Sequence, residues 1–174
     1  APPEDHPRTT PGRILNPTRF DQVTGLPRWT HLALSVRDID AMIDWYTTYT
    51  PLELLVRRED DNGYGAWLGH PDAPDTPFIL VFAQFFAGHE PDENAKPTPL
   101  GSFAHLGFEV AERCDIDDIA AVAEEGGWLA TPPLQLPYPI GYICMVRDPD
   151  GNTVEFSHDQ GVYEFAQEHF TRNS

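Results

Sequence analysis

Two histidines recur at matched positions in the sequence, and a later glutamate completes a set of metal-binding residue types. His31 lies in the segment WTHLALSV, and His105 lies in the similar segment FAHLGFEV, 74 residues further on. Glu155 lies in NTVEFSH. Two imidazoles and one carboxylate leave coordination positions open on a divalent ion and suit Fe(II), Mn(II), Zn(II) or Ni(II). The three residues therefore predict a metal centre at which a substrate can chelate.

The alternation of these segments predicts that the three side chains share one face of a sheet, since successive side chains of a strand point to opposite faces. The apolar residues that would face the core are Leu32, Leu34, Val36, Leu106, Phe108, Val110, Val154 and Phe156. His31, His105 and Glu155 fall on the other face. Each alone would be an ordinary strand residue, so the assignment depends on their matched positions and shared parity.

Each histidine segment is followed by the same order of elements. Asp38 precedes a helical apolar period over 39–49, and strand patterns follow at 52–59, 63–69 and 77–85. The second half repeats this order with a helix over 115–127 and strands near 127–131, 141–148 and 152–158. We therefore expect an α+β fold of two βαβββ modules, which form a metal-binding cleft between curved mixed sheets.

The module boundaries follow from changes in composition. Residues 1–28 contain six prolines and no hydrophobic period, which predicts an extended arm. We expect the first module at 29–87, a linker at 88–101, the second module at 102–159 and a tail at 160–174.

Composition narrows the classes of partner. Among 174 residues the formal net charge is −17, which disfavours nucleic acid and membrane surfaces and leaves a small-molecule substrate. Cys114 and Cys144 form no CxxC pair, and no apolar run predicts export or a membrane span. We expect a cytoplasmic protein.

The segments HLALSV, HLGFEV and above all DPDGNTVEF resemble the vicinal-oxygen-chelate superfamily of glyoxalases, bleomycin-resistance proteins and extradiol dioxygenases over about residues 28–159. The resemblance implies that His31, His105 and Glu155 bind one divalent metal and that the chain forms a homodimer. Whether the site forms within one chain or across two remains open at this point.

The fourth ligand place departs from the glyoxalase pattern. Glyoxalase I enzymes carry a carboxylate in the last strand of the first module, but here that strand is PFILVFAQF. Gln84 is its one polar residue, and related epimerases use Gln, so Gln84 is a candidate fourth ligand. The alternative is a strand-end amide bonded to backbone or water.

With three protein ligands the pattern resembles an extradiol dioxygenase most, which implies Fe(II) and a diol or catechol-like substrate. A glyoxalase-like lyase, isomerase or epimerase with redox-inert Mn(II), Ni(II), Zn(II) or Co(II) is the alternative. A fosfomycin-type thiol transferase would need more cations than Arg147 supplies. A metal-free ligand-sequestering module would lack the three ligands.

Other polar residues are weaker candidates. Tyr138 lies in the proline-rich stretch 131–141 and Tyr142 directly follows it. We expect this stretch to be a loop at the cleft mouth, so both tyrosines are candidate acid or base residues. A structural role is the alternative for both. His158 has the wrong parity for the cleft, and His70 and His89 lie in turn regions.

Overall fold

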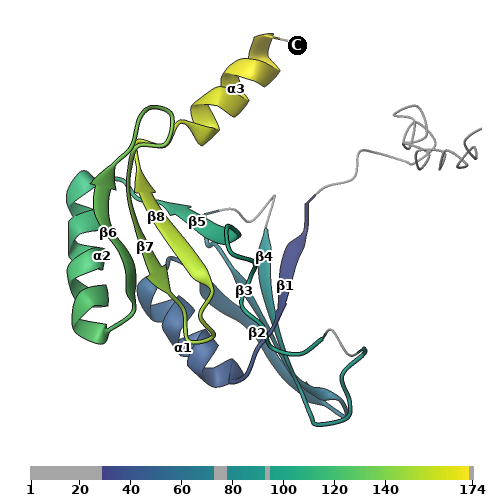
Figure 1. Cartoon of the computed structure of the whole chain (residues 1–174). Coiled ribbons are helices and arrows are strands. Elements are labelled where there is room, and N and C mark those ends of the chain that lie inside the picture. Colours follow the sequence, from purple (N-terminus) through teal and green to yellow (C-terminus); the bar gives the residue numbers. More distant parts are fainter. Residues whose placement is uncertain (1–28, 73–77, 93–94, 173–174) are drawn as a thin grey trace, which may run out of the picture.

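The computed structural model describes residues 29–72, 78–92 and 95–172, so the expected arm at 1–28 lies outside them. The first module contains β1 (His31–Ser35), α1 (Ile39–Tyr49), β2 (Glu53–Asp60), β3 (Gly63–Gly69) and β4 (Ile79–Phe85). The second contains β5 (His105–Glu109), α2 (Arg113–Gly126), β6 (Leu129–Gln135), β7 (Tyr142–Arg147) and β8 (Thr153–His158), and α3 (Val162–Arg172) follows it (Figure 1). The predicted repeat of βαβββ is confirmed.

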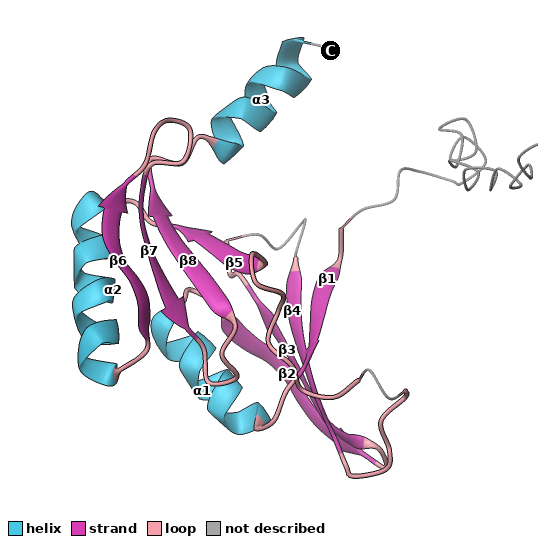
Figure 2. Cartoon of the chain, in the orientation of Figure 1, coloured by secondary structure: helices cyan, strands magenta, loops and turns pink. Residues whose placement is uncertain are grey.

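Each module builds its own four-stranded mixed sheet (Figure 2). The strand orders are β1-β4-β3-β2 and β5-β8-β7-β6. In each sheet the first strand of the module pairs in parallel with the last, and His31 lies opposite Ile79 as His105 lies opposite Thr153. The two histidines therefore occupy equivalent places, each on an edge strand of its sheet.

Local sequence accounts for the start of α1 and for the face it buries. The Asp38 carboxylate accepts hydrogen bonds from the backbone N–H groups of Asp40 and Ala41, as an N-cap does. Ile39, Met42, Ile43, Trp45 and Tyr46 are buried at helical spacing. The predicted helix is confirmed.

The helices cover one face of each sheet. α1 packs on β2, β3 and β4, and α2 packs on β6, β7 and β8. Leu34, Val36, Val154 and Phe156 are buried in the core, and Leu32, Leu106, Phe108 and Val110 pack partly against it. Strand alternation places His31, His105 and Glu155 on the opposite face, as predicted.

The two modules share one core. The rings of Trp45 in α1 and Trp128 beside β6 lie 5.6 Å apart. The Tyr46 hydroxyl donates to the buried Asp148 carboxylate at 3.0 Å, in the turn that precedes β8. Because the second contact joins α1 to the turn that starts β8, it helps to fix where Glu155 lies relative to the first module.

Two segments differ from expectation. The stretch 131–141 is predicted as a loop, but β6 continues to Gln135. It is an edge strand whose pairing with β7 shifts register twice, and prolines are tolerated at such places. Residues 162–172 are predicted as a tail, yet they form α3, with Glu164 in its first turn and His169 and Arg172 in its last, as the helix dipole favours.

No helix within the described ranges is long and apolar enough to cross a membrane.

Candidate metal centre

His105 and Glu155 lie side by side on the second sheet. β5 pairs in parallel with β8, and Glu155 lies opposite Gly107. The His105 Nε2 and Glu155 Oε2 atoms are 3.8 Å apart. Nitrogen and oxygen ligands lie about 2.1 Å from a metal such as zinc, so two ligands of one ion are at most about 4 Å apart. The pair fits one divalent ion.

A backbone contact orients the His105 ring. Its Nδ1 lies 2.8 Å from the carbonyl oxygen of Phe103. Because a carbonyl only accepts, Nδ1 of the neutral ring carries the proton, and the lone pair is left on Nε2, which faces Glu155. Metal-binding histidines are commonly held in this way by a bond at the other ring nitrogen.

The Glu155 carboxylate is buried and held in place. Glu155 is only 5% exposed. Its Oε1 accepts a hydrogen bond of 3.0 Å from the side-chain amide of Gln160, which leaves Oε2 toward His105. A buried carboxylate normally has a charged partner or a metal. Gln160 was not predicted, because it lies in the irregular segment after β8, where no pattern indicates direction.

His31 shares a cavity with His105. The cavity has a volume of about 360 Å³ and lies between β1 and β5, with walls that include Leu32, Leu80 and Phe108. The His31 Nδ1 is 2.8 Å from the Thr30 hydroxyl. Within the described ranges, no three His, Cys, Asp or Glu side chains stand close enough together to hold a metal ion. His105 and Glu155 therefore lie close to each other. His31 lines the same cavity as His105, but the three side chains do not form one group.

The fourth ligand place holds a valine. His105 lies opposite Thr153 of β8, and Glu155 is two residues further along that strand. His31 lies opposite Ile79 of β4, and the residue two further along is Val81. Gln84 falls instead on the helix-covered face of β4, where its Oε1 accepts a 2.8 Å hydrogen bond from the Ile39 N–H at the start of α1. The structure does not bring Gln84 to the face of the candidate ligands.

The two candidate tyrosines do not reach the metal face. Tyr142 lies on the α2 side of β7, where its hydroxyl donates to Asp117 at 2.7 Å and the Arg113 guanidinium lies 3.4 Å from its ring centroid. The hydrogen bond to Asp117 raises the pKa of Tyr142 above its usual range. Tyr138 is exposed and packs on Phe165 of α3. Neither tyrosine is among the residues that line the cavity at His105.

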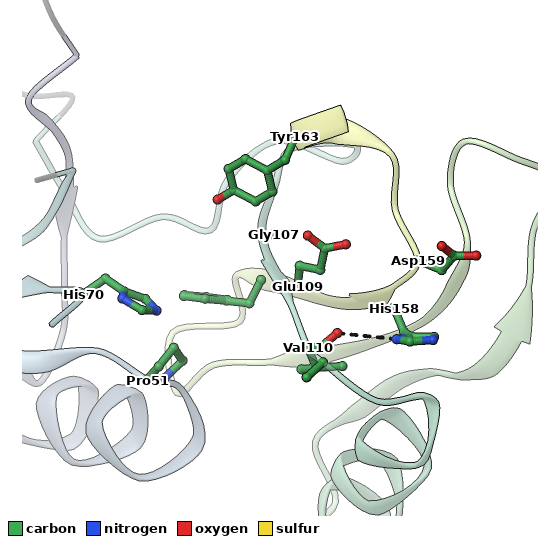
Figure 3. Close-up of a pocket in the computed structure, with 10 residues that line it drawn as sticks. Pro51, His70, Gly107, Glu109, Val110, His158, Asp159 and Tyr163 are labelled. Atoms are coloured by element: carbon green, nitrogen blue, oxygen red, sulfur yellow. Dashed lines mark hydrogen bonds between the residues drawn. The ribbon is translucent and has the colours of Figure 1, made fainter. Parts of the chain in front are cut away.

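A second cavity, of about 510 Å³, lies at the other end of β5 (Figure 3). It shares Gly107 and Phe108 with the first cavity, and its charged lining is Glu109 and Asp159. His70, His158 and Tyr163 also line it. The sequence could have predicted that Glu109 lies on the same face of β5 as His105, because the two residues are an even number of positions apart. It could not have predicted that His70 of the first module lines the same cavity as Glu109.

Comparison with known proteins agrees with this architecture. The sequence matches the Glyoxalase/Bleomycin resistance protein/Dioxygenase superfamily over residues 28–156. The chain belongs to this superfamily. The uncharacterized protein PA2024 of Pseudomonas aeruginosa is 38% identical over 134 residues, which are 77% of this chain and 90% of that protein.

Three solved structures show the same fold. A glyoxylase/bleomycin resistance protein/dioxygenase domain from Frankia sp. EAN1pec is 26% identical, with a TM-score of 0.57 over 76% of this chain and 97% of that one. The trypanothione-dependent glyoxalase I of Leishmania major is 19% identical, with a TM-score of 0.54 over 85% and 98%. TnmS3, an antibiotic-binding protein from Streptomyces sp. CB03234, is 20% identical, with a TM-score of 0.54 over 76% and 96%.

Proposed function

We propose that this superfamily member is a divalent-metal-dependent enzyme of the extradiol dioxygenase type, with His31, His105 and Glu155 as the metal ligands and a small diol or catechol-like substrate. The observation that carries the proposal is the His105–Glu155 pair, with the His105 Nε2 lone pair facing the carboxylate at 3.8 Å. Val81 at the fourth ligand place supports a set of two histidines and one glutamate, which leaves positions open.

His31, His105 and Glu155 would hold the metal, Fe(II) in this proposal, which when bound would supply a Lewis acid and a redox centre for a chelating substrate. The protein's own part is positioning. The Phe103 carbonyl holds the His105 ring, and Gln160 holds Glu155. Such outer contacts commonly change metal affinity or activity by about 10- to 100-fold when they are removed.

The cavity walls supply the rest of the site. Leu32, Leu80 and Phe108 line the cavity between His31 and His105, with Trp29 and Phe78 nearby. These apolar side chains would pack against a flat ring and exclude water from it. No Arg or Lys is among the described residues that line this cavity, so a substrate carboxylate would find no partner there.

Metal analysis of protein purified without chelators and without oxygen tests the proposal. About one iron per chain, with oxygen uptake on addition of catechol, is the expected result. The His105→Ala variant should lose both, whereas His89→Ala, in the exposed segment after β4, should keep them. Nickel, zinc, cobalt or manganese without oxygen uptake would instead favour a glyoxalase-like lyase, isomerase or epimerase. Absence of any bound metal would favour a ligand-sequestering module.

We also propose that the chain is a homodimer in the cytoplasm. The uncovered face of the first sheet exposes Val56 and Trp67, and exposed apolar patches commonly mark interfaces. Cys114 and Cys144 are free, which suits a reducing compartment. Light scattering that reports twice the chain mass of 19.5 kDa would support the dimer. A single-chain mass at micromolar concentration would refute it.

A further inference from the structure

We propose that the substrate is a catechol with a positively charged side chain, and that Glu109 selects it by binding the cationic group. This inference deepens the proposed function and rests on it. It follows from how β5 presents its side chains and from the two cavities that meet along this strand.

β5 presents His105, Gly107 and Glu109 on one face, because alternate residues of a strand point the same way. Four residues at about 3.3 Å each separate His105 from Glu109 by about 13 Å along the strand. The candidate metal ligand and the carboxylate therefore stand at the two ends of the same face.

Gly107 leaves this face open between them. A Cβ atom added at Gly107 would meet no other atom within 4 Å. Gly107 also lines both cavities, as does Phe108, so the cavity at His105 and the cavity at Glu109 adjoin. A planar ring can lie over Gly107 with its two oxygens toward His105 and Glu155 and its substituent toward Glu109.

The charge of the second cavity selects the substituent. Glu109 and Asp159 are the carboxylates in its lining, His70 and His158 are the other titratable side chains besides Tyr163, and none of the described residues around it is Arg or Lys. Figure 3 shows the Glu109 carboxylate pointing away from β5, toward the side on which Tyr163 lies. Carboxylates near the Tyr163 ring suit an ammonium group, which binds both charge and aromatic faces.

The cavity at His105 fits the other end of such a molecule. Its lining is mostly apolar, and its polar groups are the two candidate metal-binding histidines. The catechol ring and its aminoethyl side chain together span most of the distance along β5, and the Glu109 side chain covers the remainder. The net charge of −17 also favours a cation over an anion in the approach of the substrate.

The test compares three catechols that differ only at the end of a two-carbon side chain: neutral ethylcatechol, cationic aminoethylcatechol and anionic carboxyethylcatechol. Their affinities for the Fe(II)-loaded protein are measured without oxygen by titration calorimetry. We expect aminoethylcatechol to bind about three- to fivefold more tightly than ethylcatechol, as a partly exposed charge pair provides, and carboxyethylcatechol to bind least tightly.

Variants identify the residues responsible. Glu109→Gln should reduce or remove the preference for the amine while the affinity for ethylcatechol stays the same. Glu125→Gln, on the exposed side of α2, is the matched control and should keep the preference. Gly107→Leu fills the open face and should abolish binding of all three catechols with iron still bound, since the extended backbone there accepts a side chain.

The outcomes separate this inference from the proposed function. Equal binding of ethylcatechol and aminoethylcatechol would overturn the role of Glu109 and leave the catechol site standing. Unchanged binding to the Gly107→Leu variant would show that the ring lies elsewhere and would also overturn the inference. If the iron-loaded protein bound none of the three catechols, the proposed function would fail and this inference with it.

Discussion

Val81 in β4 occupies the place that Glu155 occupies in β8. Each lies two residues beyond the partner of the candidate histidine in a parallel pair of strands. The duplicated module therefore presents a carboxylate once and an isopropyl group once at equivalent positions. In the proposed site of His31, His105 and Glu155, this difference would set how many positions remain open on the metal.

Val81→Glu should convert the site to four protein ligands. We expect tighter retention of zinc or nickel and loss of oxygen uptake, because the added carboxylate occupies a position that substrate or oxygen needs. Chelator competition and an oxygen electrode measure the two effects. Ala83→Glu places the same charge two residues further along the same face of β4 and serves as the control. Full oxygen uptake by Val81→Glu would argue against the equivalence of the two places.

His105→Ala and its neighbour Leu106→Ala should have opposite effects. His105 lies on the open face, so its loss should abolish tight metal binding and change the free energy of unfolding little. Leu106 packs partly against the core, so its truncation should cost about 2 kcal/mol, near the lower end for a buried leucine. Urea unfolding and metal analysis of both variants check this. A harmless Leu106→Ala together with an unfolded His105→Ala would invert the assignment of the two faces.

Tyr46→Phe should destabilise the contact between the modules. Burial raises the pKa of Tyr46 far above its usual range, so its hydroxyl stays protonated and donates to Asp148 at 3.0 Å. Removing the donor from this buried carboxylate should cost about 1 to 3 kcal/mol in urea unfolding. Tyr49→Phe, in the last turn of the same helix and more exposed, should cost little. Similar costs for the two variants would mean that the Tyr46 hydroxyl adds no specific stability.

Cys144 should be unreactive in the folded protein. Burial, with a smaller contribution from Asp117, raises the pKa of its thiol to about 11, so about one thousandth is thiolate at pH 8. A disulfide reagent should therefore titrate one thiol, the exposed Cys114, before unfolding and two after it. Rapid native reaction of both thiols would contradict the burial.

The same shift of the Cys144 pKa predicts how stability changes with pH. An unfolded thiol has a pKa of about 8.5, below the folded value, so the folded state binds the proton more tightly. This contribution is complete below about pH 8.5 and is lost as the pH rises toward 11. The free energy of unfolding should fall across this range. Cys144→Ala should reduce the fall, and Cys114→Ala should leave it.

The sequence predicts which sheet face a side chain occupies wherever the two-residue period of a strand is clear. The two-residue period fixed the faces of β1, β5 and β8, and it also placed His158 on the face away from Glu155, where its ring lies against the Val110 carbonyl at 3.5 Å. The same reasoning could have excluded Gln84 from the metal face, because it shares parity with the buried Phe82. Tyr142 likewise shares parity with the buried Cys144.

By itself, the sequence determined the repeat of two βαβββ modules and the sheet face on which His31, His105 and Glu155 lie, since both follow from periodicity within each segment. Only the tertiary structure decided that His105 meets Glu155, that Val81 takes the fourth place, and that two cavities adjoin along β5. These depend on strand register and on the packing of α1 against the turn at Asp148, which join residues about 50 to 100 positions apart. No local period encodes such pairings, because they arise from burial of the shared core.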